Sequence, residues 1–199
     1  MRSTGGGTLE WETYSLDSLD AMPRYPVYIV SKRMRADGKV VGIYTAARLL
    51  EAGVPFMIVI EPQEKEAYKR IVEESKILVL PFSNLGQASI PARNWIWEHA
   101  KAQGHRQHWC LDDNLRRFEL ATAEGQRSKC TRAGAILAAV ENFADRYENM
   151  ALAGLHDRGF VMKPGPPLTW NTRVYSCTLI NHSLIDDSLQ ERYRGTFNE

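Results

Sequence analysis

Residues 108–114 read His-Trp-Cys-Leu-Asp-Asp-Asn, an apolar run that stops abruptly at two acids and an amide. Short apolar runs of this kind are typical of buried parallel strands. The ligands of open α/β sheets bind at the carboxyl ends of such strands. The stretch therefore predicts both a core strand and a polar site directly after it.

Three similar apolar runs precede this one, at residues 27–30, 56–60 and 77–80, and helical patterns separate them. Apolar residues at positions 43, 46, 47 and 50 predict one helix, and residues 92, 95, 96, 99 and 100 have the spacing of one continuous face of another. We expect Trp95 to pack on that face, whereas Trp97 either packs too or forms a stacking platform. Strands that alternate with helices predict a mainly parallel sheet with right-handed crossovers.

The second half of the chain has a weaker pattern. We expect a short edge strand near Phe118, a helix over residues 133–147, strands at 150–155 and 174–180, and a loop at 163–172. Residues 1–24 are polar and contain three consecutive glycines, so we expect an arm outside the core. Residues 25–199 are expected to form a single α/β domain, a mainly parallel sheet flanked by helices.

The composition excludes several classes of protein. A hydrophobic fraction of 44% and a charged fraction of 25% are those of a globular chain, and a net charge of +1 argues against a strongly basic nucleic-acid binder. No apolar run approaches the roughly 18 residues of a membrane span, and the N-terminus lacks the apolar core of a signal peptide. The cysteines Cys110, Cys130 and Cys177 lack the spacing of a zinc or redox motif, so we expect reduced thiols.

The apolar run at residues 108–111 is followed by Asp112, Asp113 and Asn114. Three oxygen-bearing side chains in a row suit a hard divalent cation such as Mg²⁺ or Mn²⁺. A metal held there would neutralise a diphosphate leaving group. The alternative, from the triplet alone, is a turn that ends the strand, because these residue types also dominate turns.

Basic residues lie at the start of one expected helix and directly after the first expected strand. Arg93 follows Pro91 at the start of a helix, where a fixed charge joins unpaired backbone N–H groups in a favourable anion site. The alternative is a solvated arginine. Residues 31–35, Ser-Lys-Arg-Met-Arg, offer backbone and cationic groups to a nucleotide, or form an ordinary surface loop.

Four blocks of the sequence together resemble a known family. They are Ser-Lys-x-x-Arg at 31–35, Val-Ile-Glu-Pro-Gln at 59–63, Ile-Pro-Ala-Arg-Asn-Trp-Ile-Trp at 90–97 and Trp-Cys-Leu-Asp-Asp-Asn at 109–114. The combination is similar to the GT-A fold glycosyltransferases, and more closely to the TET/JBP-associated glycosyltransferases of phages and kinetoplastids. The resemblance covers residues 26–199 and implies a GT-A-like, Rossmann-like fold. It implies transfer of a sugar, commonly glucose from UDP-glucose, to the hydroxymethyl group of a modified pyrimidine in DNA, such as 5-hydroxymethylcytosine or 5-hydroxymethyluracil.

The resemblance also implies roles for residues on the donor side. The family's loop after the first strand, which meets the nucleotide, matches Ser31, Lys32 and Arg35, and the acid after the second strand, near uracil or ribose, matches Glu61. The arginine of the Ala-Arg-Asn block, beside the donor, matches Arg93. The D-x-D-like motif, which binds Mn²⁺ or Mg²⁺, matches Asp112, Asp113 and Asn114, with Asp113 also expected to be catalytic and Asp112 to contact metal or ribose. One departure is Arg33-Met34, where a glycine-bearing turn is expected.

On the acceptor side, residues 171–176 match a late segment that borders the sugar and the acceptor, and we expect Trp170, Asn171 and Arg173 to read the acceptor base or stack on it. His182 follows the last expected strand, where some GT-A enzymes place a metal ligand; the alternative is a surface histidine. The last five residues resemble the start of an Asn-Glu-Asp stretch that supplies the catalytic base in inverting enzymes, so the base is expected to be Glu199 or a residue beyond it. The domain is accordingly expected to be incomplete at its C-terminus.

Three other functions are alternatives to this one. A nucleotidyltransferase also uses a metal-bound nucleotide, but it requires a glycine-rich phosphate loop after the first strand. In this chain the nearest glycine after that strand is Gly38. A glycosyltransferase with a non-DNA acceptor and a non-catalytic DNA- or nucleotide-binding module are the further alternatives. We expect a soluble protein of the cytoplasm, the host bacterial cytoplasm if it is phage-encoded, with no membrane partner. The sequence does not determine the oligomeric state.

Overall fold

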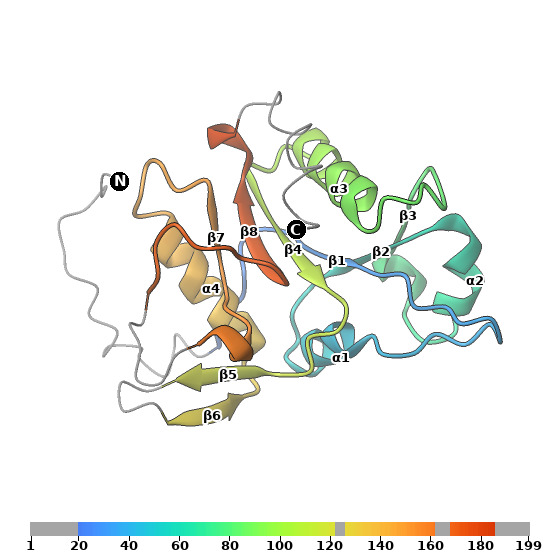
Figure 1. The fold of residues 1–199 in the computed structure, drawn as a ribbon, viewed down its shortest axis with the longest axis horizontal. Helices are drawn as coiled ribbons and strands as arrows, with labels where there is room; N and C mark the ends of the chain where they lie inside the picture. The colour runs from blue at the N-terminus through green and yellow to red at the C-terminus, as the bar shows by residue number, and fades with distance from the viewer. Residues whose placement is uncertain (1–19, 122–125, 162–167, 186–199) are drawn as a thin grey trace.

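The computed structural model describes residues 20–121, 126–161 and 168–185 (Figure 1). Six strands form one sheet in the order β3-β2-β1-β4-β8-β7. The pairs that join β1 (Val27–Val30), β2 (Met57–Ile60), β3 (Ile77–Val79) and β4 (Gln107–Asp112) are parallel. The strand β8 (Cys177–Asn181) runs antiparallel to both β4 and β7 (Leu152–Gly154). The expected mainly parallel α/β sheet is confirmed.

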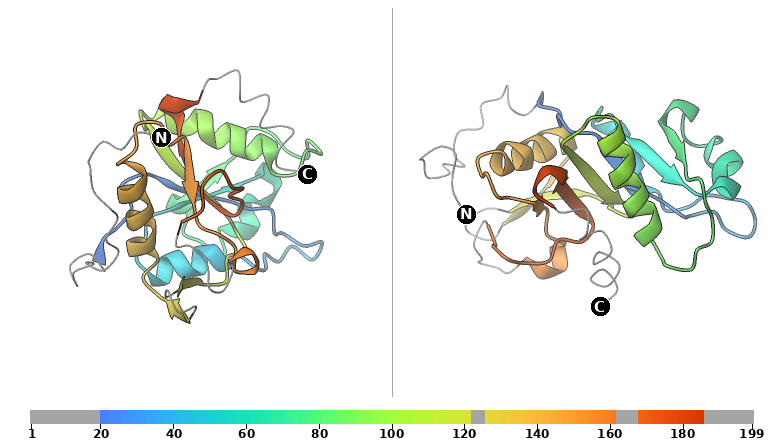
Figure 2. Two further views of the ribbon diagram at one scale, coloured as in Figure 1. Left: turned by 60° about the vertical axis from the view of Figure 1, so that its left-hand side comes forward. Right: turned by 90° about the horizontal axis from the view of Figure 1, so that it is seen from above.

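Helices cover both faces of this sheet. On one face lies α3 (Ile90–Ala102), and on the other lie α1 (Tyr44–Glu51) and α4 (Ala133–Ala144) (Figure 2). A short helix α2 (Lys65–Tyr68) follows the 3₁₀ turn η2 (Pro62–Glu64), and further 3₁₀ turns are η3 (Glu74–Lys76), η4 (Arg158–Phe160) and η5 (His182–Leu184). The strands β5 (Phe118–Ala121) and β6 (Arg127–Cys130) form a separate antiparallel pair.

Strand side chains alternate between two apolar cores, as the pleat of a strand requires. Ile29 and Leu111 point into the core shared with α1 and α4, whereas Tyr28 and Cys110 point into the core shared with α3. Both faces of the central strands are therefore buried, which explains why their sequences are continuous apolar runs rather than alternating ones.

One packing expectation differs from the structure. On α3, Trp97 is buried, so it packs and is no stacking platform, and Trp95 is partly buried, packs against the same core as expected and stacks on His99. On α1, Leu49 is buried and Leu50 is exposed. A helix of eight residues has barely two turns, so a shift of one residue in its buried face leaves the apolar pattern almost unchanged.

Residues 20–24, expected in the N-terminal arm, lie against α4. The Glu141 carboxylate, buried on α4, accepts hydrogen bonds from the backbone N–H groups of Arg24 (2.8 Å) and Tyr25 (3.2 Å) and from Trp109 Nε1 (2.8 Å). One buried acceptor thus joins this segment to β4 and α4. Residues 1–19 lie outside the described residues. Within the described part of the chain, no helix has the length and apolar character needed to cross a membrane.

Candidate functional site

A pocket of ≈ 370 Å³ lies at the carboxyl ends of β1, β2 and β4. Its wall comes from residues 31–33 after β1, Glu61 after β2, residues 85–92 of the loop and first turn of α3, and residues 112–114 after β4. The volume falls in the range of roughly 300–1,000 Å³ that is usual for small-molecule sites. The convergence follows from the topology, because parallel strands end at the same edge of the sheet.

Asp113 is the most tightly held acid of the pocket, with 5% of its surface exposed. Ser31 Oγ donates a hydrogen bond to Asp113 Oδ2 (2.7 Å). The Arg33 guanidinium donates from Nε to both carboxylate oxygens (2.8 and 2.9 Å) and from Nη2 to Oδ1 (2.7 Å). Both oxygens of Asp113 are therefore engaged by protein donors.

Tyr68 supports this group from behind. Its hydroxyl lies 2.6 Å from Ser31 Oγ and accepts a hydrogen bond from the backbone N–H of Arg33 (3.1 Å). Because the Ser31 proton goes to Asp113, the Tyr68 hydroxyl must donate to Ser31. Burial raises the pKa of Tyr68, which keeps that proton in place. The result is a directed chain of hydrogen bonds from Tyr68 through Ser31 to Asp113.

Asp112 pairs with Arg93 across the pocket wall. Arg93 Nη2 donates to Asp112 Oδ1, its Nη1 lies 3.2 Å from Cys110 Sγ, and its Nε lies 3.2 Å from Ser89 Oγ. Arg93 is only 8% exposed, so the solvated alternative is wrong. The arginine reaches the site from α3 and holds the carboxylate that the sequence placed at the end of β4.

Arg93→Lys should weaken donor use about tenfold, about 1.4 kcal/mol, and leave the melting temperature within a few degrees. An ammonium keeps the charge but not the fork that spans Asp112, Cys110 and Ser89. Titration of UDP with Mn²⁺ into the variant, beside a thermal melt, measures both effects. Arg48→Lys, which alters an arginine paired with Glu51 on α1, is the matched control. A collapsed melting temperature with unchanged UDP affinity would assign Arg93 a purely structural role.

Lys32 and Glu61 form the opposite wall of the pocket. Lys32 Nζ lies 2.8 Å from Glu61 Oε2 and donates to Asn84 Oδ1 (2.9 Å), and the Asn84 backbone N–H donates to Glu61 Oε1 (3.2 Å). Burial opposes ionisation of Glu61, but hydrogen bonds from Lys32 and Gln63 hold its pKa below the ordinary value. Glu61 is thus an ionised acceptor in the pocket.

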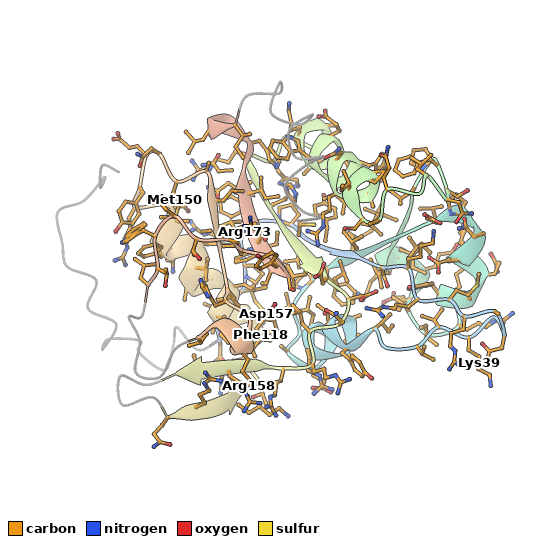
Figure 3. The ribbon with its side chains drawn as sticks, viewed as in Figure 1. Lys39, Phe118, Met150, Asp157, Arg158 and Arg173 are labelled. Carbon is orange, nitrogen blue, oxygen red and sulfur yellow. The ribbon has the colours of Figure 1, made fainter. Side chains whose placement is uncertain are left out.

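Arg35, expected to meet the nucleotide, is not among the residues that line the pocket, and Arg33 is. Arg35 starts the turn of a hairpin in which its N–H donates to the Lys39 carbonyl (2.9 Å) and Gly38, at φ +73°, makes the bend. Lys39 lies at the outer edge of the molecule (Figure 3). The glycine turn expected at residues 33–34 therefore occurs further along, which leaves Arg33 facing the site.

A divalent cation fits part of the Asp112–Asn114 triplet. Asp112 is 34% exposed at its side chain, and within the described residues no protein donor reaches its Oδ2. Asn114 is exposed beside it and also lines the pocket. One free carboxylate oxygen and one amide oxygen suit Mg²⁺ or Mn²⁺, which keep most positions for water and phosphate. Both oxygens of Asp113 already accept hydrogen bonds from Ser31 or Arg33, so neither is available to a metal. The described residues contain no cluster of three His, Cys, Asp or Glu side chains suited to a metal.

Thr45, in the first turn of α1, fixes the backbone of the triplet, a role that no sequence pattern indicated. Its hydroxyl donates to the Asp112 carbonyl and accepts from the Leu115 N–H (2.9 Å), while its own N–H donates to the Asp113 carbonyl (3.0 Å). A buried threonine near the start of an amphipathic helix is common, so only the contact itself identifies it. Thr45 ties α1 to the end of β4.

The expected acceptor residues do not form one group at the pocket. Trp170 packs on Phe143 and Tyr147, with ring centroids 5.9 and 5.6 Å away. Phe143 and Tyr147 lie on either side of Asp145 in the sequence, and Asp145 accepts a hydrogen bond from Gln107 at the amino end of β4. Trp170 therefore lies away from the pocket, which is at the carboxyl end of that strand. Asn171 and Arg173 are exposed on the segment that returns to the site just before β8. Glu199 lies outside the described residues.

His182 lies at the other end of β4 from Asp112. Its neighbour Asn181 pairs with Gln107, so about five residues, roughly 16 Å of strand, separate it from the triplet. His182 Nδ1 donates to the His105 carbonyl (3.2 Å), so its Nε2 must accept from His108 Nδ1. The structure does not bring His182 to the pocket, and we leave it out of the metal set.

The His108–His182 pair should make the protein less stable in mild acid. Burial, followed by neighbouring charges, lowers the pKa of His108, and burial lowers that of His182, so both are neutral in the fold. The unfolded chain binds their protons below about pH 6.5, whereas the folded chain binds them only at lower pH. Stability that is present above about pH 6.5 is therefore lost as the pH falls, by at most about 1.4 kcal/mol per pH unit for each histidine. Urea unfolding of the wild type and of His182→Gln at pH 7.5 and 5.5 measures this, with exposed His156→Gln as the control. An identical pH dependence in all three would contradict it.

The order of the strands, the helices on both faces and the polar pocket at the carboxyl ends define a GT-A-like α/β protein. A family model described as TET-Associated Glycosyltransferase matches residues 25–199. The chain belongs to this family and is a glycosyltransferase, as the four sequence blocks implied. A search of curated proteins and a search of solved structures each found no match.

Proposed function

We propose that this glycosyltransferase uses a UDP-sugar, with glucose the first candidate, and transfers the hexose to the hydroxymethyl group of a modified pyrimidine in DNA. The observation that carries the donor half is the pocket itself, which combines the cations Lys32 and Arg33 with the acids Glu61 and Asp112 at the carboxyl ends of parallel strands. A diphosphate needs cations, and a ribose needs a hydrogen-bond acceptor. One pocket offers both.

In this proposal Lys32 and Arg33 bind the donor diphosphate, and Glu61 accepts a hydrogen bond from ribose or uracil. Asp112 and Asn114 would hold Mn²⁺ or Mg²⁺, which supplies charge neutralisation for the departing diphosphate. Arg93 orients Asp112, while Asp113 with Ser31 and Tyr68 orients Arg33. Fixed cations aimed at developing negative charge are an effective way to lower such a barrier.

The DNA half of the proposal rests on the family resemblance. Arg116, Arg117 and Lys129, on the segment around β5 and β6, supply positive charge for phosphate contacts. With a net charge of +1 for the whole chain, such binding should be weak and steeply dependent on salt. A target base inside a duplex would have to leave the stack to reach a pocket, at a cost of a few kcal/mol.

The test is incubation with UDP-glucose and Mn²⁺ of three matched duplexes that carry one 5-hydroxymethylcytosine, one 5-hydroxymethyluracil or neither. Mass analysis of the digested nucleosides should show one added hexose on a hydroxymethylated base and none on the unmodified duplex. Equal labelling of all three duplexes, or labelling of protein or lipid alone, would remove the DNA acceptor and leave the glycosyltransferase. Attachment of a nucleotide instead of a hexose would favour the nucleotidyltransferase alternative.

A further inference from the structure

The carboxylates near the carboxyl end of β4 differ in whether a cation holds them. Among the described residues, those around the pocket and on β5 are each ion-paired: Asp112 with Arg93, Asp113 with Arg33, Glu61 with Lys32, and Glu119 with Arg117 and Arg158. Asp157 forms no ion pair within that same part of the chain, and its one hydrogen bond there is a long contact from Ser176 Oγ to its Oδ2 (3.5 Å). Asp157 is also exposed. Of these five carboxylates, Asp157 alone has neither an ion pair nor a short hydrogen bond among the described residues, so both of its oxygens can accept a proton.

Asp157 is connected to the site through Ser176. The backbone N–H of Asp112 donates to the Ser176 carbonyl (2.9 Å), and the Ser176 hydroxyl donates to Asp157. The neighbouring thiol supports this closeness: burial raises the pKa of Cys177, and the charges of Asp112 and Asp157 both add to that shift. The two carboxylates thus lie near one buried sulfur.

The strand order places the pocket that Asp112 lines and the Asp157 carboxylate on opposite sides of β4. The pocket is lined from β1, β2, β4 and α3, whereas Asp157 follows β7 and Ser176 precedes β8, on the other side of β4. Figure 3 shows Asp157 on the segment between β7 and η4 and Arg173 on the segment that leads into β8. A donor in the pocket therefore lies on the β1 side of the Asp112–Asn114 turn, whereas Asp157 lies on its β8 side.

The backbone beneath Asp157 is held in place. The N–H of Leu155 donates to the Cys177 carbonyl (3.1 Å). A Cβ at Gly154 would lie 2.2 Å from the same carbonyl oxygen and 2.4 Å from Val174 Cγ1, so only glycine permits this approach. The carboxylate thus stands three residues beyond a fixed contact, which suits a group that must meet a substrate in one geometry.

We propose that Asp157 is the catalytic base of the transfer, an inference that rests on the proposed function. Asp157 takes the proton of the acceptor hydroxyl as the hydroxyl oxygen bonds to the anomeric carbon of the sugar. The bond from that carbon to the diphosphate oxygen breaks, and its electron pair leaves with UDP. Asp157 later releases the proton to water. A single displacement of this kind inverts the anomeric configuration, so UDP-α-glucose gives a β-linked product.

Asp157→Asn should lower kcat on hydroxymethylated duplex by about 10²–10⁴-fold, the usual contribution of a general base. UDP affinity and melting temperature should stay at the wild-type values, because the side chain makes one long hydrogen bond and lies outside the donor pocket. Glu51→Gln, the same change at an exposed, ion-paired acid of α1, is the matched control and should transfer at the wild-type rate. Glu199→Gln tests the residue that the family resemblance implies.

A thiol acceptor separates a base from a merely structural residue. A duplex with 5-mercaptomethyluracil carries a thiol, which ionises several pH units below an alcohol and so depends less on a base. Asp157→Asn should therefore be far less impaired on it than on the hydroxymethyl duplex. If the wild type transfers but Asp157→Asn stays within tenfold on the hydroxymethyl duplex, or if the product is α-linked, the inference fails and the proposed function stands. If the wild type labels neither duplex, the proposed function itself fails.

Discussion

Asp113→Ala should reduce sugar transfer by about 10³-fold, the loss seen when a preorganised charge-stabilising contact is removed. Asp113 accepts from Ser31 Oγ and from two nitrogens of Arg33, so its removal frees the cation that we assign to the diphosphate. The fold should survive, because Arg33 is 39% exposed at its side chain and water can solvate it. Steady-state transfer with UDP-glucose, together with a thermal melt, measures both outcomes.

Arg33→Ala is the informative partner of this variant. If Asp113 acts by holding Arg33, the two single variants and the double variant should be about equally impaired, because both changes remove the same interaction. If Asp113 instead binds the metal directly, Asp113→Ala should raise the Mn²⁺ concentration for half-maximal activity and Arg33→Ala should not. Transfer by Asp113→Ala within about tenfold of the wild type, roughly 1.4 kcal/mol of barrier, would count against both roles.

Removal of divalent metal should lower transfer by about 10³-fold as well, and Mn²⁺ should restore it. In the proposed function, Lys32 and Arg33 would only partly neutralise the charge of a departing diphosphate, and a bound cation stabilises such charge by several kcal/mol. The measurement is transfer after dialysis against EDTA, followed by titration with Mn²⁺ or Mg²⁺. Full activity after dialysis, with no response to added Mn²⁺, would contradict the metal requirement.

Asp112→Ala connects this requirement to the assigned residues. Direct titration of Mn²⁺ in the presence of UDP should show weaker metal binding for Asp112→Ala, a readout that does not depend on catalysis. Asp37→Asn, at an exposed aspartate whose hydrogen bond stays within the hairpin turn, should bind Mn²⁺ like the wild type. Equal Mn²⁺ affinity in wild type and Asp112→Ala would show that the metal does not bind at this turn.

Much of the site could be located before the structure was known, and the partners within it could not. Residues 31–33, Glu61 and 112–114 were expected at strand ends and do line one pocket. The choice of Arg33 over Arg35, however, depends on where a hairpin bends, and the burial of Arg93 depends on a carboxylate that lies 19 positions further along the chain. Asp157 gave no signal at all, because nothing in its local sequence shows that it lies beside Ser176.

The sequence by itself determined the elements of the sheet, the family and the strand ends at which chemistry gathers. Apolar runs and helical periods act over a few residues, and a polar triplet that ends a core strand is visible in the order of the letters. The tertiary structure alone decided which charge holds which: Arg33 with Asp113, Arg93 with Asp112, and Asp157 with no cation among the described residues. It also places His182 at the amino end of β4, far from the Asp112–Asn114 turn. Coulomb energies and hydrogen bonds depend on distances of a few ångströms across the sheet, and those distances exist only once strands far apart in the chain have been laid side by side.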